Sequence, residues 1–181
     1  MKLLLHACCG PCSAGCLGGL AEEGIEPVLF WYNPNIHPWT EYRSRRDCLE
    51  VLAREEGLEL LKIDEYGLRL FLGGLNTVET GGDSGAGRCN YCYRLRLEKT
   101  AEAARQGNFD CFSTTLLISP YQRHEDIKKT GEDLAVRYGV PFFYRDFRPL
   151  FRAGQENARG RGFYMQKYCG CIFSEEERYT R

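Results

Sequence analysis

Seven of the ten cysteines lie in three short groups at the start, middle and end of this 181-residue chain. The groups are Cys8-Cys9-Gly-Pro-Cys12, Cys89-Asn-Tyr-Cys92 and Cys169-Gly-Cys171. Thiolate sulfur is a preferred ligand of zinc and of iron–sulfur clusters, so cysteines at such close spacing indicate a metal site. Because the groups are far apart in sequence, one shared site requires the tertiary fold to assemble it.

The first group has two interpretations. Cys9-Gly-Pro-Cys12 matches the C-x-x-C motif of thioredoxin-like redox proteins, and the same spacing allows two sulfurs to bind one metal. The adjacent Cys8 adds a third thiol, which a simple disulfide switch does not need. The residues of this group alone leave both alternatives open.

The other two groups suit metal binding. Cys89 and Cys92 stand at a predicted helix start, where both sulfurs can converge on one metal or on one face of a cluster. Cys169 and Cys171 are spaced too tightly for an unstrained disulfide, and their aromatic surroundings are not typical of a disordered tail.

Seven thiols exceed the four that a structural zinc or one [4Fe–4S] cluster requires. The surplus favours a catalytic centre, either a cluster beside a second metal or a redox-active cysteine pair that supplies electrons to a cluster. Three cysteines lie outside the groups. We expect Cys48 and Cys111 to be buried among apolar neighbours, whereas Cys16, one helical turn after Cys12, could approach the site.

Short apolar runs alternate with helical patterns along the chain. We expect strands at Lys2–Ala7, Val28–Tyr32, Leu58–Ile63, Phe109–Thr114 and Pro141–Tyr144. We expect helices at Pro11–Gly24, Thr40–Glu56, Arg88–Gln106, Glu125–Tyr138 and Gly154–Gln166, with a short helix or turn at Tyr66–Leu72. The four glycines of the first helix indicate close packing.

This alternation predicts one α/β domain over residues 1–181, built on a doubly wound, Rossmann-like parallel sheet. Residues 146–181 form a C-terminal extension that we expect to complete the metal site. Ligands of such folds bind at the carboxyl ends of the strands, near the point where the strand order reverses. Cys8 and Cys9 follow the first predicted strand, where that rule places chemistry.

The composition predicts a folded cytoplasmic protein. Hydrophobic residues make up 43% of the chain, and no apolar run approaches the roughly 18 residues of a membrane span. The N-terminus does not have the pattern of a signal peptide. A reducing cytosol favours thiolates that bind metal or do redox chemistry over structural disulfides.

The net charge of −1 excludes a chain-wide basic field, but the charge is unevenly distributed. Residues 137–167 carry seven basic and two acidic side chains, interleaved with Tyr and Phe. Such a segment suits phosphate contacts and base stacking, although a solvated helix face has a similar composition. The candidates for contacts with the phosphates of a nucleic acid are Arg148, Arg152, Arg159 and Arg161.

Six motifs in order along the chain carry a resemblance to a known family. They are Cys8-Cys9-Gly-Pro-Cys12, Tyr32-Asn-Pro-Asn-Ile-His-Pro38, Arg88-Cys-Asn-Tyr-Cys-Tyr-Arg-Leu-Arg-Leu-Glu98, Phe112-Ser-Thr-Thr-Leu-Leu-Ile-Ser-Pro120, Asp146-Phe-Arg-Pro149 and Tyr168-Cys-Gly-Cys-Ile-Phe-Ser174. Over essentially its whole length the chain resembles the QueH-type epoxyqueuosine reductases.

The resemblance implies the last step of queuosine biosynthesis, in which the epoxide of epoxyqueuosine at the wobble position of tRNA is reduced to an alkene. It implies an adenine nucleotide α-hydrolase-like fold, a [4Fe–4S] cluster beside a second metal ion, expected to be iron, and no cobalamin. The partners would be a tRNA that bears epoxyqueuosine in its anticodon and an unidentified electron donor. The resemblance implies that some relatives carry Asp in place of Cys12, and an oxygen ligand would suit the second metal better than the cluster.

Within this implied centre, we expect Cys9, Cys89 and Cys92, with Cys8 or Cys171, to hold the cluster. Cys12 and Cys169, with the remaining thiol, would hold the second metal. The glycine-rich segment Thr80–Gly87 precedes Cys89 and could close over the site.

Polar residues near the predicted strand ends complete the expected site. Cys12, His37 and Tyr32 are the candidate catalytic residues. His37 could bind metal or donate a proton to the departing oxygen, although a backbone hydrogen bond is the more common role of histidine in such a Pro-rich turn. The candidates for nucleoside contacts are Asn33, Ser113, Thr114, Thr115 and Ser119. The hydroxyl groups of the serines and threonines could instead cap helices.

Three rival functions share parts of this pattern. An iron–sulfur-dependent tRNA thiolation enzyme should have an ATP-binding loop after the first strand, where this chain has cysteines. A zinc-stabilised RNA-binding module would contain no iron. A thioredoxin-like reductase would work with a metal-free dithiol.

Overall fold

The computed structural model describes residues 1–76 and 86–180. Within these residues the centre of the protein is a four-stranded parallel sheet. Its strands are β1 (Leu3–His6), β2 (Val28–Trp31), β3 (Leu60–Lys62) and β4 (Cys111–Thr114). The strand order is β3-β2-β1-β4, so the chain builds one side of β1 first and later crosses to the other side.

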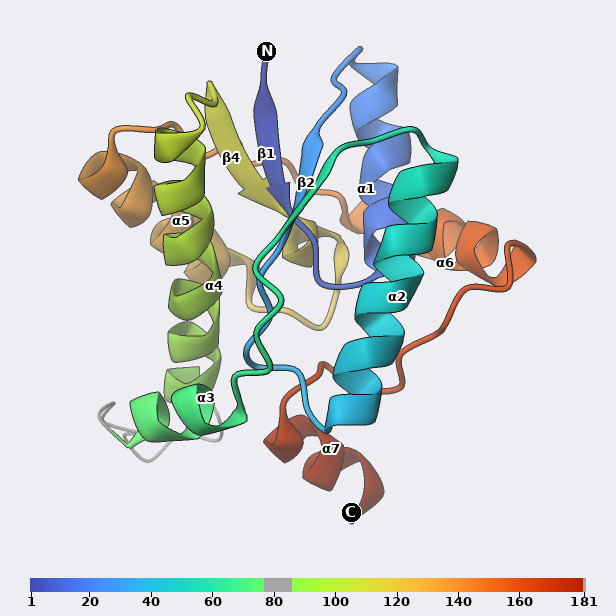
Figure 1. Cartoon of the computed structure of the whole chain (residues 1–181), viewed down its shortest axis with the longest axis vertical. Helices are drawn as coiled ribbons and strands as arrows, with labels where there is room; N and C mark the ends of the chain where they lie inside the picture. The colour runs from blue at the N-terminus through green and yellow to red at the C-terminus, as the bar shows by residue number, and fades with distance from the viewer. Residues whose placement is uncertain (77–85, 181) are drawn as a thin grey trace.

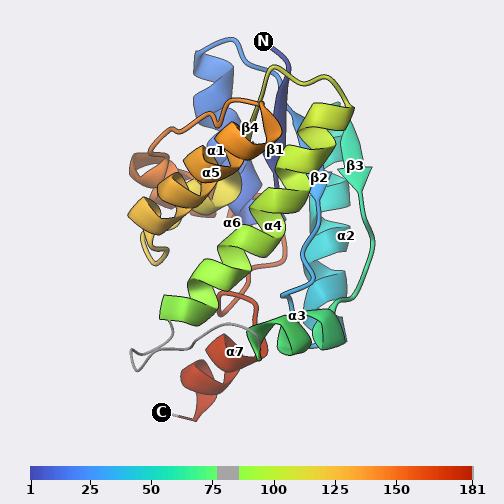
Figure 2. The same ribbon diagram turned by 90° about the vertical axis from the view of Figure 1, so that its left-hand side faces the viewer.

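Helices cover both faces of the sheet (Figure 1). One face carries α1 (Gly10–Glu22), α2 (Trp39–Glu55) and α6 (Phe151–Gly160), and the other carries α4 (Ala86–Gln106) and α5 (His124–Tyr138). Figure 2 shows α4 lying across the front of the sheet with α2 behind it. This arrangement confirms the prediction of a doubly wound parallel α/β fold.

Two short helices lie beyond the carboxyl ends of the strands (Figure 1). They are α3 (Leu68–Leu75) and α7 (Ile172–Tyr179). The 3-10 helix η1 (Thr115–Ile118) directly follows β4, and the 3-10 helix η2 (Arg148–Leu150) directly precedes α6. The end of the sheet where ligands of this fold class bind is therefore enclosed by segments distant in sequence.

The first helix approaches α6 very closely, as its glycines indicated. A Cβ atom on Gly154 would lie 2.8 Å from the Cα atom of Gly15, and a Cβ atom on Gly15 would lie 2.3 Å from a methyl group of Ile118. Gly18, on another side of α1, has no neighbour within 4 Å of such an atom. Close packing thus explains why residue 15 is a glycine, but it does not explain the glycine at position 18.

The prediction of a fifth strand at Pro141–Tyr144 is wrong. It makes one parallel bridge, between Phe142 and Phe112, supported by two backbone hydrogen bonds of 3.0 and 2.8 Å on either side of Phe112. Pro141 has no N–H group to extend the ladder. Further along, Arg145 turns away to donate a 2.6 Å hydrogen bond to the carbonyl of Gly19 on α1.

The C-terminal helices also differ from the prediction. The helix expected at Gly154–Gln166 starts three residues earlier, at Phe151, and ends at Gly160, just before Gly162 adopts a positive φ of 68°. Helix α7 was not predicted from the sequence. Most of the glycine-rich segment Thr80–Gly87 lies outside the described residues, and its last two residues, Ala86 and Gly87, already belong to α4.

Among the helices of residues 1–76 and 86–180, none combines the length and the apolar character needed to cross a membrane.

Candidate metal centre and active site

The first cysteine group lies where β1 ends and α1 begins. β1 is fully buried and consists of three leucines and His6, and α1 starts at Gly10 with Pro11 in its first turn, where a missing N–H group costs no hydrogen bond. β2 and β4 flank β1, so the strand order reverses here. Cys8 and Cys9 therefore occupy the point where ligands of doubly wound folds bind.

The three thiols of this group converge. The Sγ atoms of Cys8, Cys9 and Cys12 all lie within 4.8 Å of one another, and all three residues are buried. The Sγ atoms of Cys8 and Cys9 are 3.8 Å apart. Two sulfurs on one tetrahedral ion, with metal–sulfur bonds of about 2.3 Å, lie about 3.8 Å apart. The group thus has the donor atoms and the spacing of a metal site.

Cys8 is the thiol of this group best prepared to be a thiolate. Hydrogen bonds from Cys12 and Cys9 hold its pKa well below the usual range despite its burial, and Thr115 contributes to the same effect. The Thr115 hydroxyl lies 3.6 Å from the Cys8 sulfur. Thr115 is in place because β4 pairs with β1 up to the Thr114–His6 pair.

The other four cysteines form a second group near α3. Cys89 and Cys92 lie one turn apart on α4, and Cys169 and Cys171 directly precede α7. Burial raises the pKa of the Cys92 thiol to about 12, and the nearby thiols of Cys169, Cys171 and Cys89 add to the rise. The Cys92 and Cys171 side chains pack together with Phe71 in a small buried cluster.

Arg96 is a buried cation that faces both groups. Its Nη2 atom donates a 3.1 Å hydrogen bond to the Cys92 sulfur, and its Nε atom donates one of the same length to the Cys92 carbonyl. Burial acts to lower the pKa of Arg96, but Cys92, Cys169 and Cys8 outweigh it and raise the pKa above its usual value. The guanidinium therefore favours thiolates in both groups.

Arg45 ties the C-terminal cysteine segment to α2. Its Nη1 and Nη2 atoms donate hydrogen bonds of 2.9 and 2.8 Å to the carbonyls of Cys169 and Tyr168, and its Nε atom pairs with Glu41 at 2.6 Å. Tyr164 donates a hydrogen bond to the other oxygen of Glu41. Both partners of the ion pair are buried. The hydrogen bonds of this buried pair hold Cys169 at a defined position relative to α2.

A cavity of about 830 Å³ opens onto these cysteines. Three of the thiols line it, those of Cys8, Cys12 and Cys169. Two amide side chains also line it: Gln166 donates a 3.4 Å hydrogen bond to the Cys12 sulfur, and Gln122 donates one of 3.3 Å to the Cys169 sulfur. The volume is in the range of pockets that hold a small molecule.

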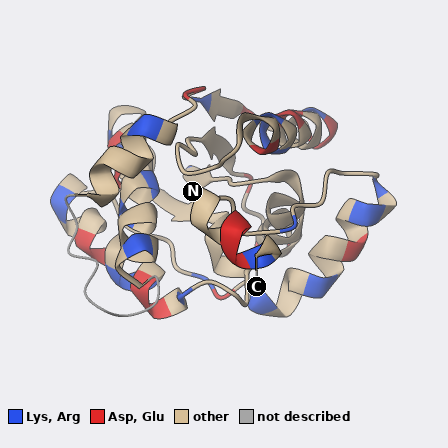
Figure 3. Cartoon of the chain, turned by 90° about the horizontal axis from the view of Figure 1, so that it is seen from below, with Lys and Arg blue, Asp and Glu red and all other residues tan. Residues whose placement is uncertain are grey.

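The cavity is locally basic. Its lining contains the cations Arg45, Arg152, Arg159, Lys167 and Arg178, and one carboxylate, that of Glu156. Figure 3 looks at the end of the molecule that carries α7 and shows both charge signs interspersed over this end as a whole. The excess of positive charge is therefore a property of the cavity rather than of the whole surface.

The family comparison decides between the rival functions. A model of the family described as epoxyqueuosine reductase QueH matches residues 3–177. The chain belongs to the QueH family of epoxyqueuosine reductases. This confirms the family that the six motifs predicted, and it separates the chain from thiolation enzymes and zinc-stabilised modules.

Individual QueH relatives cover nearly the same length. The epoxyqueuosine reductase QueH of Dehalococcoides mccartyi is 38% identical over 99% of this chain and 96% of its own length. That of Thermotoga maritima is 34% identical over 97% of this chain and 91% of its own length. The QueH relatives are named as reductases, which places this chain among oxidoreductases.

A solved structure supports the fold alone. A predicted subunit of a tRNA methyltransferase from Methanocaldococcus jannaschii superposes with a TM-score of 0.56 at 14% identity, covering 100% of this chain and 93% of the other. This superposition agrees with the doubly wound α/β fold of the QueH chain.

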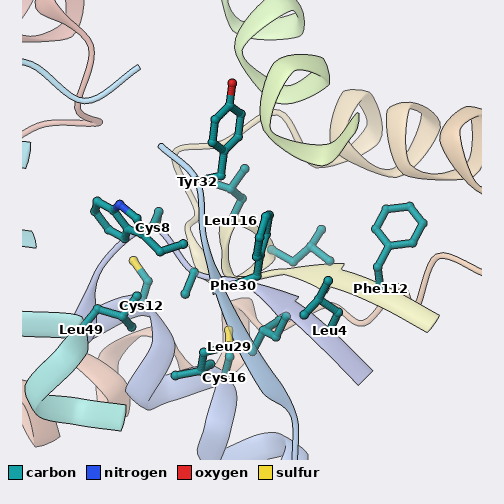
Figure 4. Close-up of a cluster of buried hydrophobic side chains, with 14 of the residues drawn as sticks. Leu4, Cys8, Cys12, Cys16, Leu29, Phe30, Tyr32, Leu49, Phe112 and Leu116 are labelled. Atoms are coloured by element: carbon teal, nitrogen blue, oxygen red, sulfur yellow. The ribbon is translucent and has the colours of Figure 1, made fainter. Parts of the chain in front are cut away.

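His37 and Tyr32 are not among the residues that line the cavity. His37 is buried against Tyr66 and Phe71, and its Nε2 atom donates a 3.1 Å hydrogen bond to the Pro34 carbonyl. Burial lowers the pKa of His37 to about 4, so its ring is neutral at pH 7. Figure 4 shows the Tyr32 ring extending away from Cys12. A catalytic role for either residue stays a prediction.

The predicted nucleoside-binding residues are divided between the cavity and the core. Ser119 lines the cavity. Asn33 donates a 2.9 Å hydrogen bond to the Ala7 carbonyl, and Thr114 bonds the His6 ring and caps η1 through the Leu116 N–H group. The Ser113 hydroxyl is buried without a partner among the described residues.

The four predicted arginines are also divided. Arg152 and Arg159 of α6 line the cavity. Arg148 pairs with Asp146 at 2.6 Å, and Arg161 pairs with Glu55 and Glu56 at 2.5 and 2.6 Å. Arg148 and Arg161 are therefore engaged within the protein and are the weaker candidates for RNA contacts.

The sequence reasoning missed several residues of the site. Arg45 stands three residues after the inward-facing Tyr42, and Arg96 stands four residues after Cys92, so helical spacing placed both on buried faces. Cys48 and Cys111 are buried in the core as predicted, and Cys16 is also fully buried there. The other missed residues are Tyr121, Gln122, Gln166 and Arg178, and only Arg178, two turns after Cys171, had a comparable signal.

Proposed function

We propose that this protein reduces the epoxide of epoxyqueuosine to the alkene of queuosine in tRNA. The observation that carries the proposal is the cavity, in which the buried thiols of Cys8 and Cys12 and the exposed Cys169 meet a lining of arginine and lysine side chains. Membership of the QueH family supports the reaction, and the cations suit a phosphate-bearing substrate.

The reaction requires two electrons and two protons. Both C–O bonds of the epoxide break, a carbon–carbon double bond forms, and the oxygen leaves as water. A pair of the thiols can supply two electrons once, by forming a disulfide, so repeated turnover requires an external reductant. A metal centre bound by the cysteines would supply electron transfer and Lewis acidity at the departing oxygen.

The donor set fits such a centre. Cys8, Cys9 and Cys12 lie within 4.8 Å of one another, and three thiolates leave a position open on a four-coordinate ion. Cys89, Cys92, Cys169 and Cys171 number the four ligands of a [4Fe–4S] cluster. We propose that the four hold the cluster and that the three hold the second metal, expected to be iron. This division replaces the expectation that Cys9 binds the cluster with Cys89 and Cys92.

The remaining residues of the cavity would bind and orient the substrate. Arg152 and Arg159 would contact phosphate groups of the tRNA. The Ser119 hydroxyl would form a hydrogen bond with a hydroxyl group of the nucleoside. Gln122 and Gln166, whose amides already contact cysteine sulfurs, would orient those sulfurs.

Conversion of the substrate tests this proposal. The protein, purified without oxygen, is incubated with epoxyqueuosine-containing tRNA and a chemical reductant. The tRNA is then digested to nucleosides, which are separated and identified by mass spectrometry. We expect queuosine to form with wild type and with Cys111→Ala, a buried cysteine outside the three groups, and not with Cys92→Ala. Protein that holds one zinc and no iron, and that forms no queuosine, would contradict the proposal.

A further inference from the structure

Tyr121 is the most exposed aromatic residue of the part of the chain that the structure describes, with 83% of its surface accessible. It lies between η1 and α5, in the loop that follows β4. Despite this exposure it belongs to the lining of the cysteine cavity. A large aromatic side chain at the mouth of a cavity, left open to solvent, requires an explanation other than core packing.

The ring is held in place by its surroundings. The Tyr121 N–H group donates a 3.3 Å hydrogen bond to the Ser119 hydroxyl, and the ring makes an edge contact with Phe151, with centroids 6.0 Å apart. The next residue, Gln122, accepts a 2.8 Å hydrogen bond from Tyr93 and donates one to the Cys169 sulfur. The loop that carries Tyr121 is thus attached to the cysteine site itself.

Cations line the same cavity as Tyr121. Phe151, which contacts Tyr121, is followed by Arg152 on α6, and Arg159 lies two turns further along the same helix. Both arginines line the cavity with Tyr121. An exposed aromatic ring next to side chains that neutralise phosphate is the combination that binds single-stranded nucleic acid, because every base has a π-face to stack.

We propose that Tyr121 stacks against an unpaired base of the tRNA anticodon loop, next to the modified nucleotide. This inference rests on the proposed function. The thiols of Cys8 and Cys12 are buried at the inner end of the cavity, whereas Tyr121 is exposed at its rim. When the epoxide of the modified nucleotide reaches these thiols, the modified base itself lies inside the cavity. The base at the level of Tyr121 is then that of a neighbouring nucleotide.

The test compares four proteins with two substrates. The proteins are wild type, Tyr121→Ala, Tyr121→Phe and the control Tyr179→Ala, which removes a 58% exposed aromatic outside the cavity lining. The substrates are an anticodon stem-loop that contains epoxyqueuosine and the free epoxyqueuosine nucleoside. The rate is measured over a range of substrate concentrations to separate kcat from KM.

We expect Tyr121→Ala to raise KM for the stem-loop by about 5- to 150-fold with little change in kcat, as loss of one stacked base predicts. Tyr121→Phe and Tyr179→Ala should stay close to wild type, and the free nucleoside should be converted equally by all four proteins. An unchanged KM of Tyr121→Ala for the stem-loop would overturn the inference. An equal loss with the free nucleoside would also overturn it, because the ring would then stack on the modified base.

The outcome separates this inference from the proposed function. If wild type converts neither substrate, the proposed function fails. If wild type converts the stem-loop and Tyr121→Ala does so with the same KM, only the stacking role fails.

Discussion

The guanidinium of Arg45 donates a 2.9 Å hydrogen bond to the main-chain carbonyl of Cys169, 124 residues further along the chain. Through this contact a charged side chain of α2, rather than an apolar one, positions the last cysteine group. A buried arginine is stable here because Glu41 balances its charge and two carbonyls accept its remaining hydrogen bonds.

Removal of Arg45 should loosen the C-terminal cysteines. Arg45→Met leaves Glu41 buried without a counter-ion, and breaking such a pair costs about 3–5 kcal/mol. We expect this loss in denaturant unfolding, together with less iron per chain after reconstitution. The control Arg46→Met, on the same helix, removes exposed ion pairs with Asp47 and Asp64 and should cost less than about 1 kcal/mol. Iron content equal to wild type in Arg45→Met would refute the positioning role.

Arg96 should tune the redox centre. The Arg96→Met variant removes a positive charge and an N–H···S hydrogen bond from Cys92, and both favour the reduced, more negative state of an iron–sulfur cluster. We expect a midpoint potential more negative by tens of millivolts, where about 59 mV corresponds to a tenfold change for one electron. An EPR-monitored reductive titration measures it. Arg96→Lys should restore part of the shift, and identical potentials for all three proteins would contradict this role.

His6 should make the fold sensitive to acid. Burial and the nearby Arg96 lower the pKa of His6 to about 4 from 6.5, so the folded protein resists protonation that the unfolded chain accepts. The unfolded chain thus binds more protons between these values, and stability falls as the pH drops from 6.5 towards 4. For one such group the loss between pH 7 and pH 5 is about 2 kcal/mol.

Urea unfolding at pH 7 and pH 5 tests this pH dependence. His6→Gln, which can retain polar contacts to Thr114 and Tyr32, should lose about 2 kcal/mol less than wild type over that interval. Both proteins are compared in the same metal state, since acid release of metal would affect both. Equal pH dependence in the two proteins would show that His6 is protonated as easily in the folded state as in the unfolded one.

Gly154 should tolerate no side chain. In most helices Gly→Ala stabilises by about 0.5–1 kcal/mol, but a Cβ atom here would lie 2.8 Å from the backbone of Gly15. We expect Gly154→Ala to destabilise the protein by about 1–3 kcal/mol through overpacking. The control Gly18→Ala, with open space around it, should stabilise. A more stable Gly154→Ala variant would mean that α6 shifts freely on α1.

Particular residues show how much the sequence could predict. The apolar run Leu3–Leu5 and the cysteines after it identify the first strand and its chemical edge, because a buried parallel strand leaves few other interpretations. The three cysteine groups are recognisable by spacing alone. Their meeting point is set by the order of the strands and by the return of residues 146–180 across α1, which are tertiary features.

Other parts of the site had no local signal. No residue of α7 is buried, so Ile172–Tyr179 lacks the apolar stripe by which a helix is predicted. Helical spacing indicates that positions 45 and 96 are buried, but it predicts apolar side chains there. The two charges are explained only by the contacts of Arg45 with Glu41 and Cys169 and of Arg96 with Cys92. Tyr121 could not be identified because an exposed tyrosine in a loop has no periodicity.

A single-turnover experiment tests directly whether this chain reduces epoxyqueuosine. The iron-loaded protein is reduced, freed of excess reductant, and mixed anaerobically with a sub-stoichiometric amount of epoxyqueuosine-containing tRNA. We expect queuosine to form without further reductant while the protein becomes oxidised by two electrons for each queuosine. Protein that binds the tRNA yet stays reduced, with all epoxyqueuosine recovered, would contradict the assignment of this chain as the reductase.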